Sequence, residues 1–310
     1  MNYCFGVDIG GTTVKIGLFE FNGQLIDRWE IKTRTENEGM SIIPDIVESI
    51  EQKLQEKQIE KNRILGIGVG VPAPVSKEGI VRGSANLGWK YKEVRHEIEE
   101  ATRLHVSVGN DANIAALGEM WKGGGYGNLN LIMVTLGTGV GGGIIVNGRV
   151  LSGANGAGGE IGHMCVNYKE QEACGCGKKG CLEQYASATG IVRLAKRKLA
   201  ATSRPSILLP LDLSAKSVFD AVKAGDEVAK EIAEEFGTYL GYALANIAVL
   251  ADPATIVIGG GVSKAGEIIL PYIEKKYQEY AFNSNKDVRF SLAELGNDAG
   301  IYGAAKMILN

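Results

Sequence analysis

The chain has 310 residues, of which 45% are hydrophobic and 22% are charged, and its formal net charge is -3. This length can bury a large core and favours two domains over one. The acidic balance argues against a general nucleic-acid binder, and the longest apolar stretch, Gly237 to Ala251, is too short to span a membrane. Because no signal peptide precedes the first strand-like run, we expect a cytoplasmic protein that binds neither nucleic acid nor a membrane.

Residues 3–32 predict a β-hairpin unit. One strand ends at Asp8, a glycine turn with two threonines follows, and a second strand leads through an Asn-Gly pair into a third. Residues 131–148 repeat this design, with a strand, a glycine turn, a strand and a closing Asn-Gly pair. We therefore expect an internal duplication in which each turn offers backbone N–H groups and hydroxyls to a phosphate.

The second glycine turn also matches the dinucleotide pattern G-x-G-x-x-G between Gly137 and Gly142. That pattern requires a helix directly after the glycines, whereas the residues that follow are β-branched and end in a hairpin turn. No Walker A sequence occurs either. Phosphate binding is therefore expected from hairpin turns, not from a strand-to-helix loop.

The segment between the two hairpin units is expected to form helices and strands, with helices at 44–58, 94–103 and 112–121 and strands at 64–71 and 106–108. Asp111 stands where the last of these strands meets the last helix. On this pattern alone it is either the N-cap of that helix or a catalytic carboxylate, and the N-cap is the more common use of such a residue.

Four of the five cysteines fall between residues 165 and 181, and one of three histidines lies just upstream. His163, Cys174, Cys176 and Cys181 form a Cys3His set, which predicts a structural zinc site. A disulfide loop or free buried thiols are the alternatives, and a reducing cytosol favours the metal.

Two carboxylates accompany the predicted zinc site. Glu160 lies three residues before His163, and Glu183 lies two residues after Cys181. Ionised carboxylates accept hydrogen bonds from hydroxyl groups, so acids fixed beside an imidazole indicate a pocket for a sugar or other polyol. Two ordinary surface glutamates remain the alternative.

The C-terminal part is expected to be mostly helical. We expect helices at 186–199, 214–222, 226–250, 264–280 and 299–309. Two strands are expected at 255–258 and 288–292, and a glycine turn at Gly259–Gly261 follows the first of them. Residues 201–213, which include Pro205 and Pro210, are expected to form a loop. Ser214 is the expected N-cap of the second of these helices.

Six motifs in this order resemble the ROK family of sugar kinases and repressors, and within it the bacterial glucokinases. They are Asp8-Ile-Gly-Gly-Thr-Thr-Val-Lys15, Asn110-Asp111, Leu136-Gly-Thr-Gly-Val-Gly-Gly-Gly143, Glu160-Ile-Gly-His163, Cys174-Gly-Cys-Gly-Lys-Lys-Gly-Cys-Leu-Glu183 and Ile258-Gly-Gly-Gly-Val-Ser263. Each motif alone is a weak or moderate signal, but together, in this order, the six motifs span nearly the whole chain.

The resemblance implies an α/β actin/hexokinase-like (ribonuclease H-like) fold of two domains with an interdomain cleft and a zinc knot. We expect a small domain at 1–113 plus 298–310 and a large domain at 114–297, with the zinc segment at 160–183. The implied activity is ATP-dependent phosphorylation of a hexose, D-glucose to glucose 6-phosphate, with Mg2+ and Zn2+ as metals. The implied assembly is a homodimer or a larger homo-oligomer.

The resemblance also implies residue roles. Asp111 resembles the general base, and the sugar contacts correspond to Asn110, Asp111, Glu160, His163 and Glu183. The ATP-binding positions correspond to Asp8, Gly10, Gly11, Thr12, Thr13 and Lys15 in the first phosphate motif, Gly137, Thr138 and Gly139 in the second, and Gly259, Gly260 and Gly261 against adenosine. Ala73 departs from the family, which usually has glycine there, and its methyl group would alter sugar fit or closure.

A sugar-responsive repressor is the main rival, because ROK repressors share the fold and the knot. Such a repressor needs a DNA-binding segment ahead of the core, and here the first phosphate motif begins at Asp8. Among kinases, N-acetylmannosamine, fructose, mannose or allose are alternative sugars, and polyphosphate is an alternative donor.

Overall fold

The computed structural model describes residues 1–209 and 212–309. The chain divides into two compact units. The first comprises Met1–Gly127, Gly148–Gly159 and the residues from Asn297 on, and the second comprises Asn128–Asn147 and Glu160–Gly296. Residues 210 and 211 of the expected 201–213 loop, Pro210 among them, lie outside the described residues.

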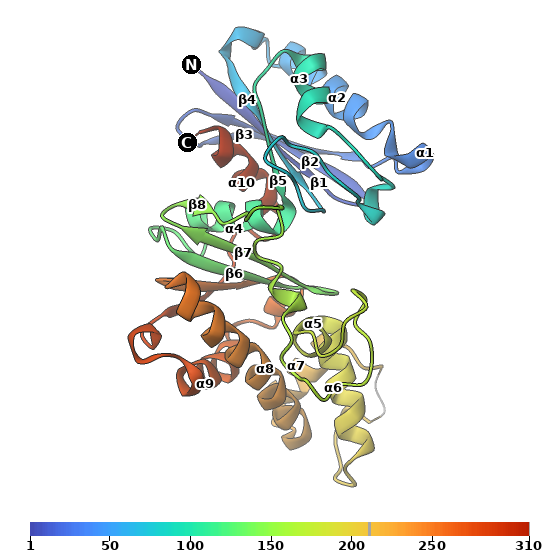
Figure 1. Cartoon of the computed structure of the whole chain (residues 1–310), viewed down its shortest axis with the longest axis vertical. Coiled ribbons are helices and arrows are strands. Elements are labelled where there is room, and N and C mark those ends of the chain that lie inside the picture. The colour runs from blue at the N-terminus through green and yellow to red at the C-terminus, as the bar shows by residue number, and fades with distance from the viewer. Residues whose placement is uncertain (210–211, 310) are drawn as a thin grey trace. The chain divides into compact units, whose positions relative to one another are not determined.

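The first sheet has the order β3-β2-β1-β4-β5 (Figure 1). Its strands are β1 (Tyr3–Ile9), β2 (Thr13–Glu20), β3 (Leu25–Lys32), β4 (Ile64–Val71) and β5 (Val106–Asn110). β1 is antiparallel to β2 and parallel to β4, and β4 is parallel to β5. Because β1, β4 and β5 run in the same direction, the segments that follow them emerge at one edge of the sheet.

The second sheet has the order β10-β9-β6-β7-β8. Its strands are β6 (Leu131–Leu136), β7 (Val140–Val146), β8 (Arg149–Val150), β9 (Thr255–Gly259) and β10 (Arg289–Leu292). β6 is antiparallel to β7 and parallel to β9, and β9 is parallel to β10. Read from β8, this sheet repeats the order and strand directions of the first, as the predicted duplication requires.

Helices pack around the first sheet, with α2 and α3 on one face and α4 and α10 on the other (Figure 1). The helices are α1 (Glu36–Gly39), α2 (Ile42–Glu56), α3 (Val94–Thr102), α4 (Asp111–Lys122) and α10 (Ala299–Ile308). α10 packs directly on Gly68 of β4, where a Cβ atom would lie only 1.8 Å from the carbonyl oxygen of Ala304. Glycine in the strand therefore lets helix and sheet approach closely.

The second unit is largely helical (Figure 1). Its helices are α5 (Glu183–Ala186), α6 (Ala188–Ala200), α7 (Ala215–Lys223), α8 (Glu227–Ala251) and α9 (Leu270–Tyr280). The described part of the chain also contains 3-10 turns at Lys61–Arg63, Ala85–Leu87, Ile161–His163, Val262–Ala265, Glu267–Ile269, Asn283–Asn285 and Gly296–Asp298. Ser214 caps α7 as predicted: its hydroxyl accepts from the Ser217 N–H, and its own N–H donates to the Ser217 hydroxyl at 2.9 Å.

Two expected helices differ from the structure. The helix expected at 186–199 is broken at Ser187, whose extended backbone and side chain cap α6. The helix expected at 264–280 begins only at Leu270, because Gly266 adopts a φ of 88° that a continuous helix cannot contain. Among the described residues, no helix combines the length and apolar character that a membrane crossing needs.

Candidate functional site

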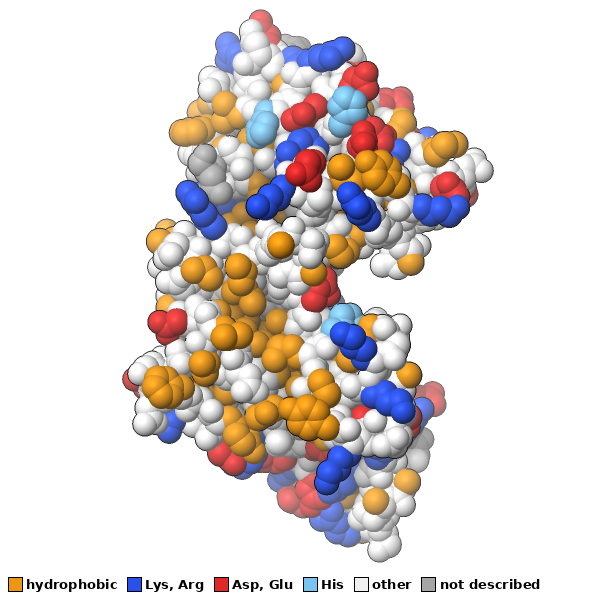
Figure 2. Space-filling view, in the orientation of Figure 1, with side chains coloured by type: hydrophobic (Ala, Val, Ile, Leu, Met, Phe, Trp, Pro, Cys, Tyr) orange, Lys and Arg blue, Asp and Glu red, His pale blue; other side chains and the backbone are white. Residues whose placement is uncertain are grey.

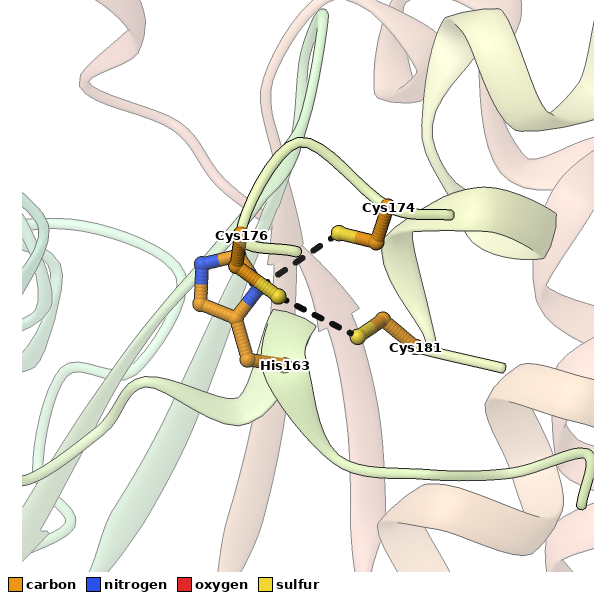
Figure 3. A group of neighbouring side chains, drawn as sticks. All are labelled: His163, Cys174, Cys176 and Cys181. Atoms are coloured by element: carbon orange, nitrogen blue, oxygen red, sulfur yellow. Dashed lines mark hydrogen bonds between the residues drawn. The ribbon is translucent and has the colours of Figure 1, made fainter. Parts of the chain in front are cut away.

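The four predicted zinc ligands converge in the second unit (Figure 3). Their donor atoms all lie within 4.8 Å of one another. The sulfurs of Cys176 and Cys181 are 3.6 Å apart, and the sulfur of Cys174 is 3.9 Å from Nδ1 of His163. A tetrahedral zinc with bonds of about 2.3 Å to sulfur and about 2.0 Å to nitrogen separates its donors by roughly 3.5–3.8 Å. The donor set and its spacing therefore fit zinc.

Local turns bring these ligands together. The N–H of Cys174 donates to the carbonyl of Lys178 at 2.7 Å, and the N–H of Gly177 donates back to Cys174 at 2.9 Å. Gly180 has a φ of 73°, and a Cβ atom there would lie 2.0 Å from a backbone oxygen, so no other residue fits. None of the described cysteines is in a disulfide. The backbone N–H of Lys178 lowers the pKa of Cys176, whereas burial raises the pKa of Cys174.

Glu183 lies against the cysteine and histidine cluster. Its Oε1 accepts a hydrogen bond from the Cys174 thiol at 2.8 Å and is 3.8 Å from Nδ1 of His163. Glu160 precedes the 3-10 turn that carries His163, and its backbone carbonyl accepts from the His163 N–H at 3.2 Å. The side chain of Glu160 is exposed. The structure thus brings Glu183 to the cluster through its side chain and Glu160 through its backbone.

The second glycine turn is next to Glu183. A Cβ atom on Gly139 would lie 2.7 Å from Oε2 of Glu183, so the turn can approach this carboxylate only without a side chain. The start of α6 fixes the turn from the other side, because the Ala188 N–H donates to the Gly137 carbonyl at 2.8 Å and the Thr189 hydroxyl donates to the Thr138 carbonyl at 2.9 Å. One carboxylate therefore connects the predicted metal ligands to a predicted phosphate turn.

The Gly259–Gly261 turn follows β9, which is the parallel neighbour of β6. Both glycine turns therefore lie at the same edge of the second sheet. Gly260 has a φ of 84°, and a Cβ atom there would be 2.6 Å from the backbone nitrogen of Leu136. This position therefore requires glycine, and both Gly260 and Gly261 are exposed.

In the first unit, the Gly10–Thr13 turn is tightly closed. The Gly10 N–H donates to the Thr13 carbonyl at 2.9 Å, and the Thr33 hydroxyl donates to the Gly10 carbonyl at 2.7 Å. Lys15 is opposite Asp8 in the β1–β2 ladder, and its Nζ donates to the carbonyl of Asn297 at 2.9 Å. The turn thus has the predicted hairpin form.

Asp8 is a strongly perturbed carboxyl group in this region. Burial, together with the negative charge of Asp111, raises the pKa of Asp8 to about 6, and Lys15 opposes the shift. A Cβ atom on Gly300 would be 2.4 Å from the Asp8 carboxylate, which shows how closely α10 covers it. The charge on Asp111 therefore acts on Asp8, as expected at the common edge of β1 and β5.

The N-cap of α4 is Asn110, so the structure does not support the alternative that Asp111 is a simple N-cap, and the catalytic role of Asp111 stays a prediction. The Asn110 side chain accepts from the Asn113 N–H at 3.2 Å, and its Nδ2 donates to the Ala73 carbonyl at 3.3 Å. Asp111 is the first helical residue, and its Oδ1 accepts from the Ala112 N–H at 2.8 Å.

Glu170 is an important residue that the sequence did not reveal. Its buried carboxylate accepts from the Tyr185 hydroxyl at 2.5 Å and pairs with Arg193 at 2.8 Å and Arg197 at 3.2 Å. Burial opposes the charge, but the hydrogen bonds from Arg197 and Tyr185 outweigh it and lower the pKa of Glu170. This cluster connects the predicted zinc segment to α6, and no spacing of residues in the sequence predicts it.

Comparison with known proteins defines the family. A sequence model of the ROK family matches residues 4–310. The chain belongs to the ROK family. Among its ROK relatives, the glucokinase of Halalkalibacterium halodurans is 43% identical over 309 residues, which cover 98% of this chain and 94% of that protein. The family prediction is confirmed.

Solved ROK structures have the same fold. The ROK hexokinase of Thermus thermophilus has a TM-score of 0.82 and 32% identity, covering 98% of this chain and 96% of its own. A ROK family glucokinase of Streptomyces griseus, in complex with glucose and AMPPNP, has a TM-score of 0.75 and 33% identity over 99% of both chains. The predicted α/β fold of two sheets, matching ROK hexokinases, is confirmed.

Proposed function

We propose that this ROK protein transfers the γ-phosphoryl group of ATP to D-glucose in the cytoplasm, giving ADP and glucose 6-phosphate. The relative at 43% identity is a glucokinase, and the S. griseus glucokinase was solved with glucose and an ATP analogue. The observation in this chain that best supports the proposal is the position of Glu183, which contacts both the cysteine and histidine cluster and the second glycine turn.

Asp111 is the proposed general base. Phosphoryl transfer demands alignment, charge neutralisation and a proton acceptor more than covalent participation by the protein. In this scheme the glucose hydroxyl oxygen forms a bond to the γ-phosphorus, its proton passes to the Asp111 carboxylate, and the bond from phosphorus to ADP breaks. Asn110 holds the start of α4 through its two hydrogen bonds and contacts the sugar.

The first phosphate motif has two proposed functions. Gly10, Gly11, Thr12 and Thr13 bind phosphate oxygens, with Lys15 adding positive charge. Asp8 supplies a hard carboxylate oxygen suited to Mg2+ through bound water. When bound, Mg2+ neutralises phosphate charge, and a nearby cation would favour the ionised form of Asp8 over the protonated form that burial favours.

The second unit supplies the remaining proposed contacts. With zinc on Nδ1 of His163, its Nε2 is left to bind a sugar hydroxyl. If zinc were bound, Cys174 would carry no proton, and the Glu183 oxygen that now accepts from this thiol would be able to accept from a sugar hydroxyl. Glu160 is the third proposed sugar contact in this unit. Gly137, Thr138 and Gly139 bind phosphate, and Gly259, Gly260 and Gly261 contact adenosine.

A homodimer or larger assembly is also proposed. Figure 2 shows hydrophobic side chains on the surface of the second unit. Val249 and Leu250 at the end of α8 and Phe282 after α9 are exposed by 58%, 88% and 62%. Light scattering of the purified protein tests this proposal, and a monomeric mass at micromolar concentration would refute it.

A kinetic comparison of sugars tests the function. The purified protein is assayed with ATP and Mg2+ against glucose, mannose, fructose, allose and N-acetylmannosamine, by coupling ADP formation to NADH oxidation. We expect the largest kcat/KM with glucose. A larger value with another sugar would correct the substrate, and the Ala73→Gly variant would show whether the added methyl group affects the choice. No ADP formation with any sugar would refute a kinase.

A further inference from the structure

The first unit contains a cavity of about 190 Å3 beside the start of α4. Its walls come from the residues after β4, from β5, from the segment around Ser152 and from α10. The polar residues that line it are Ser76, Lys77, Arg95, Asn110, Asn113 and Ser152. Asn110, a proposed sugar contact, is among the lining residues, whereas Asp111 and the residues of the glycine turns are not, so the cavity adjoins the proposed sugar site without including the proposed general base.

Two of the lining residues carry a buried polar side-chain atom that has no hydrogen-bond partner among the described residues. Asn113 is 97% buried; its Nδ2 donates to the Gly158 carbonyl at 3.2 Å, while its Oδ1 accepts nothing. The Nε of Arg95 is likewise buried without an acceptor. A buried polar group left unpaired costs about 1–3 kcal/mol, so such groups in native proteins usually meet water or a ligand.

Arg95 is held in place by its surroundings. Gly79 has a φ of 78°, and a Cβ atom there would lie 2.5 Å from the Cβ of Arg95, so the arginine stem packs directly on this turn. Lys77 adds a second positive charge. Glu78 is the neighbouring acid, and its carboxylate accepts from the Ser76 hydroxyl at 2.7 Å. The lining itself therefore carries two cations and no carboxylate.

A matching ligand combines an anionic group for Lys77 and Arg95 with a hydroxyl that donates to Asn113. Water alone occupies roughly 30 Å3 per molecule, so the cavity has room for several waters or for one small organic molecule. It is smaller than the roughly 300–1,000 Å3 typical of sites for drug-sized ligands. Size and lining together favour a small phosphorylated polyol.

We propose that this cavity is a second binding site for a sugar phosphate, with the phosphate on Lys77 and Arg95 and a sugar hydroxyl on Oδ1 of Asn113. The choice of glucose 6-phosphate as probe rests on the proposed function, whose product it is. Asn113 is bonded to the Asn110 cap that precedes Asp111. Occupancy of the cavity therefore stiffens the start of α4 and changes the turnover rate.

The test is calorimetric titration of glucose 6-phosphate into protein already holding saturating glucose and AMPPNP, which block binding at the catalytic groups. We expect one further equivalent to bind to the wild type, Arg95→Met to weaken this binding at least tenfold, and Arg63→Met, an exposed arginine of the same unit, to leave it unchanged. If circular dichroism shows that Arg95→Met is unfolded, Lys77→Met replaces it.

The proposal is wrong if the wild type binds no further equivalent of glucose 6-phosphate. It is also wrong if the wild type and the folded variant, Arg95→Met or Lys77→Met, bind glucose 6-phosphate equally well. Inorganic phosphate is titrated in parallel, and equal affinity for it would refute a site that recognises the sugar hydroxyl. Because heat is recorded and not turnover, loss of binding on changing Arg95 is meaningful even if no sugar is phosphorylated. Failure of the proposed function is seen separately, in the kinetic assay.

Discussion

At the scale of single residues, the two adjacent residues at the start of α4, Asn110 and Asp111, have different roles. Asn110 caps the helix, and Asp111 is left with a carboxylate held by the Ala112 N–H. We predict that Asp111→Asn lowers kcat roughly 10²–10⁴-fold with little change in the glucose KM, because the shape stays and only the basicity is lost. Steady-state kinetics measure this, with the exposed Asp220→Asn as control. A near wild-type rate would show that Asp111 is not the base.

Asp8 gives a prediction for the pH dependence of stability. Its pKa is about 6 in the folded protein, against 3.8 for an ordinary aspartate, so the folded state holds the proton more strongly than the unfolded chain. This contribution to stability is complete below pH 4 and is lost as pH rises through 6, a loss of up to about 3 kcal/mol. We predict that Asp8→Asn raises the free energy of unfolding at pH 7.5 but not at pH 4, measured by urea denaturation without Mg2+ or nucleotide.

The control for Asp8 is Asp287→Asn, which changes an exposed carboxylate in the second unit. It should alter the free energy of unfolding by less than about 0.5 kcal/mol at either pH. If Asp8→Asn destabilises the protein at pH 7.5, the buried carboxylate is stabilised by its neighbours and the pKa is not raised.

At the scale of elements, the predicted zinc segment would connect metal binding to sugar binding. Cys176→Ser replaces a soft thiolate by a mostly protonated hydroxyl, which weakens the metal site without changing a proposed sugar or ATP contact. We predict substoichiometric zinc by elemental analysis and a glucose KM raised far more than the ATP KM. Cys165→Ser is the matched control, because this exposed cysteine is not one of the four ligands. Normal glucose affinity without zinc would show that the fold alone holds Glu183.

The Glu170 cluster makes a second prediction about this segment. Glu170→Gln removes the charge that pairs with Arg193 and accepts hydrogen bonds from Arg197, and a hydrogen bond to a charged group contributes about 1.5–3 kcal/mol. We predict a lower free energy of unfolding by about that amount and a faster loss of zinc to a chelator. Glu172→Gln is the control, because this carboxylate pairs with the same arginines but is 67% exposed, and it should cost less than about 1 kcal/mol. If Glu170→Gln and Glu172→Gln lowered the free energy of unfolding equally, burial of the Glu170 carboxylate would not contribute to its effect on stability.

Local chemistry explains which elements could be predicted. The hairpins, the α7 cap and the cluster of four predicted metal ligands follow from turn residues, capping side chains and soft donors at short spacing, and all three features appear in the structure. The break at Ser187 and the Glu170 cluster depend on partners brought together by the fold, so no local pattern contains them. Asn110 was assigned to sugar alone because a cap and a ligand contact use the same side-chain chemistry.

At the scale of the whole molecule, the duplication accounts for the arrangement of the candidate groups. Both sheets use the same strand order, so both place a glycine hairpin turn beside the ends of parallel strands. The connection from β8 to β9 is where the second unit differs, and it carries the metal ligands, Glu160, Glu183 and α5 to α8. The predicted domain boundaries at residues 113 and 298 stay predictions, as do the assembly and the roles of the site residues.

The remaining rival at this scale is a sugar-responsive repressor of the same family. Binding of a protein to DNA depends mainly on positive side chains that neutralise phosphates, and it weakens steeply with salt. This chain has 33 lysines and arginines against 36 acids, and Figure 2 shows both signs interspersed over the drawn face of the first unit. We predict no sequence-specific retention of DNA from its own promoter region in a gel-shift assay at about 150 mM salt, with or without glucose. A retained band that resists competitor DNA and disappears on adding sugar would establish the repressor function instead, because only a specific, sugar-controlled interface produces both effects.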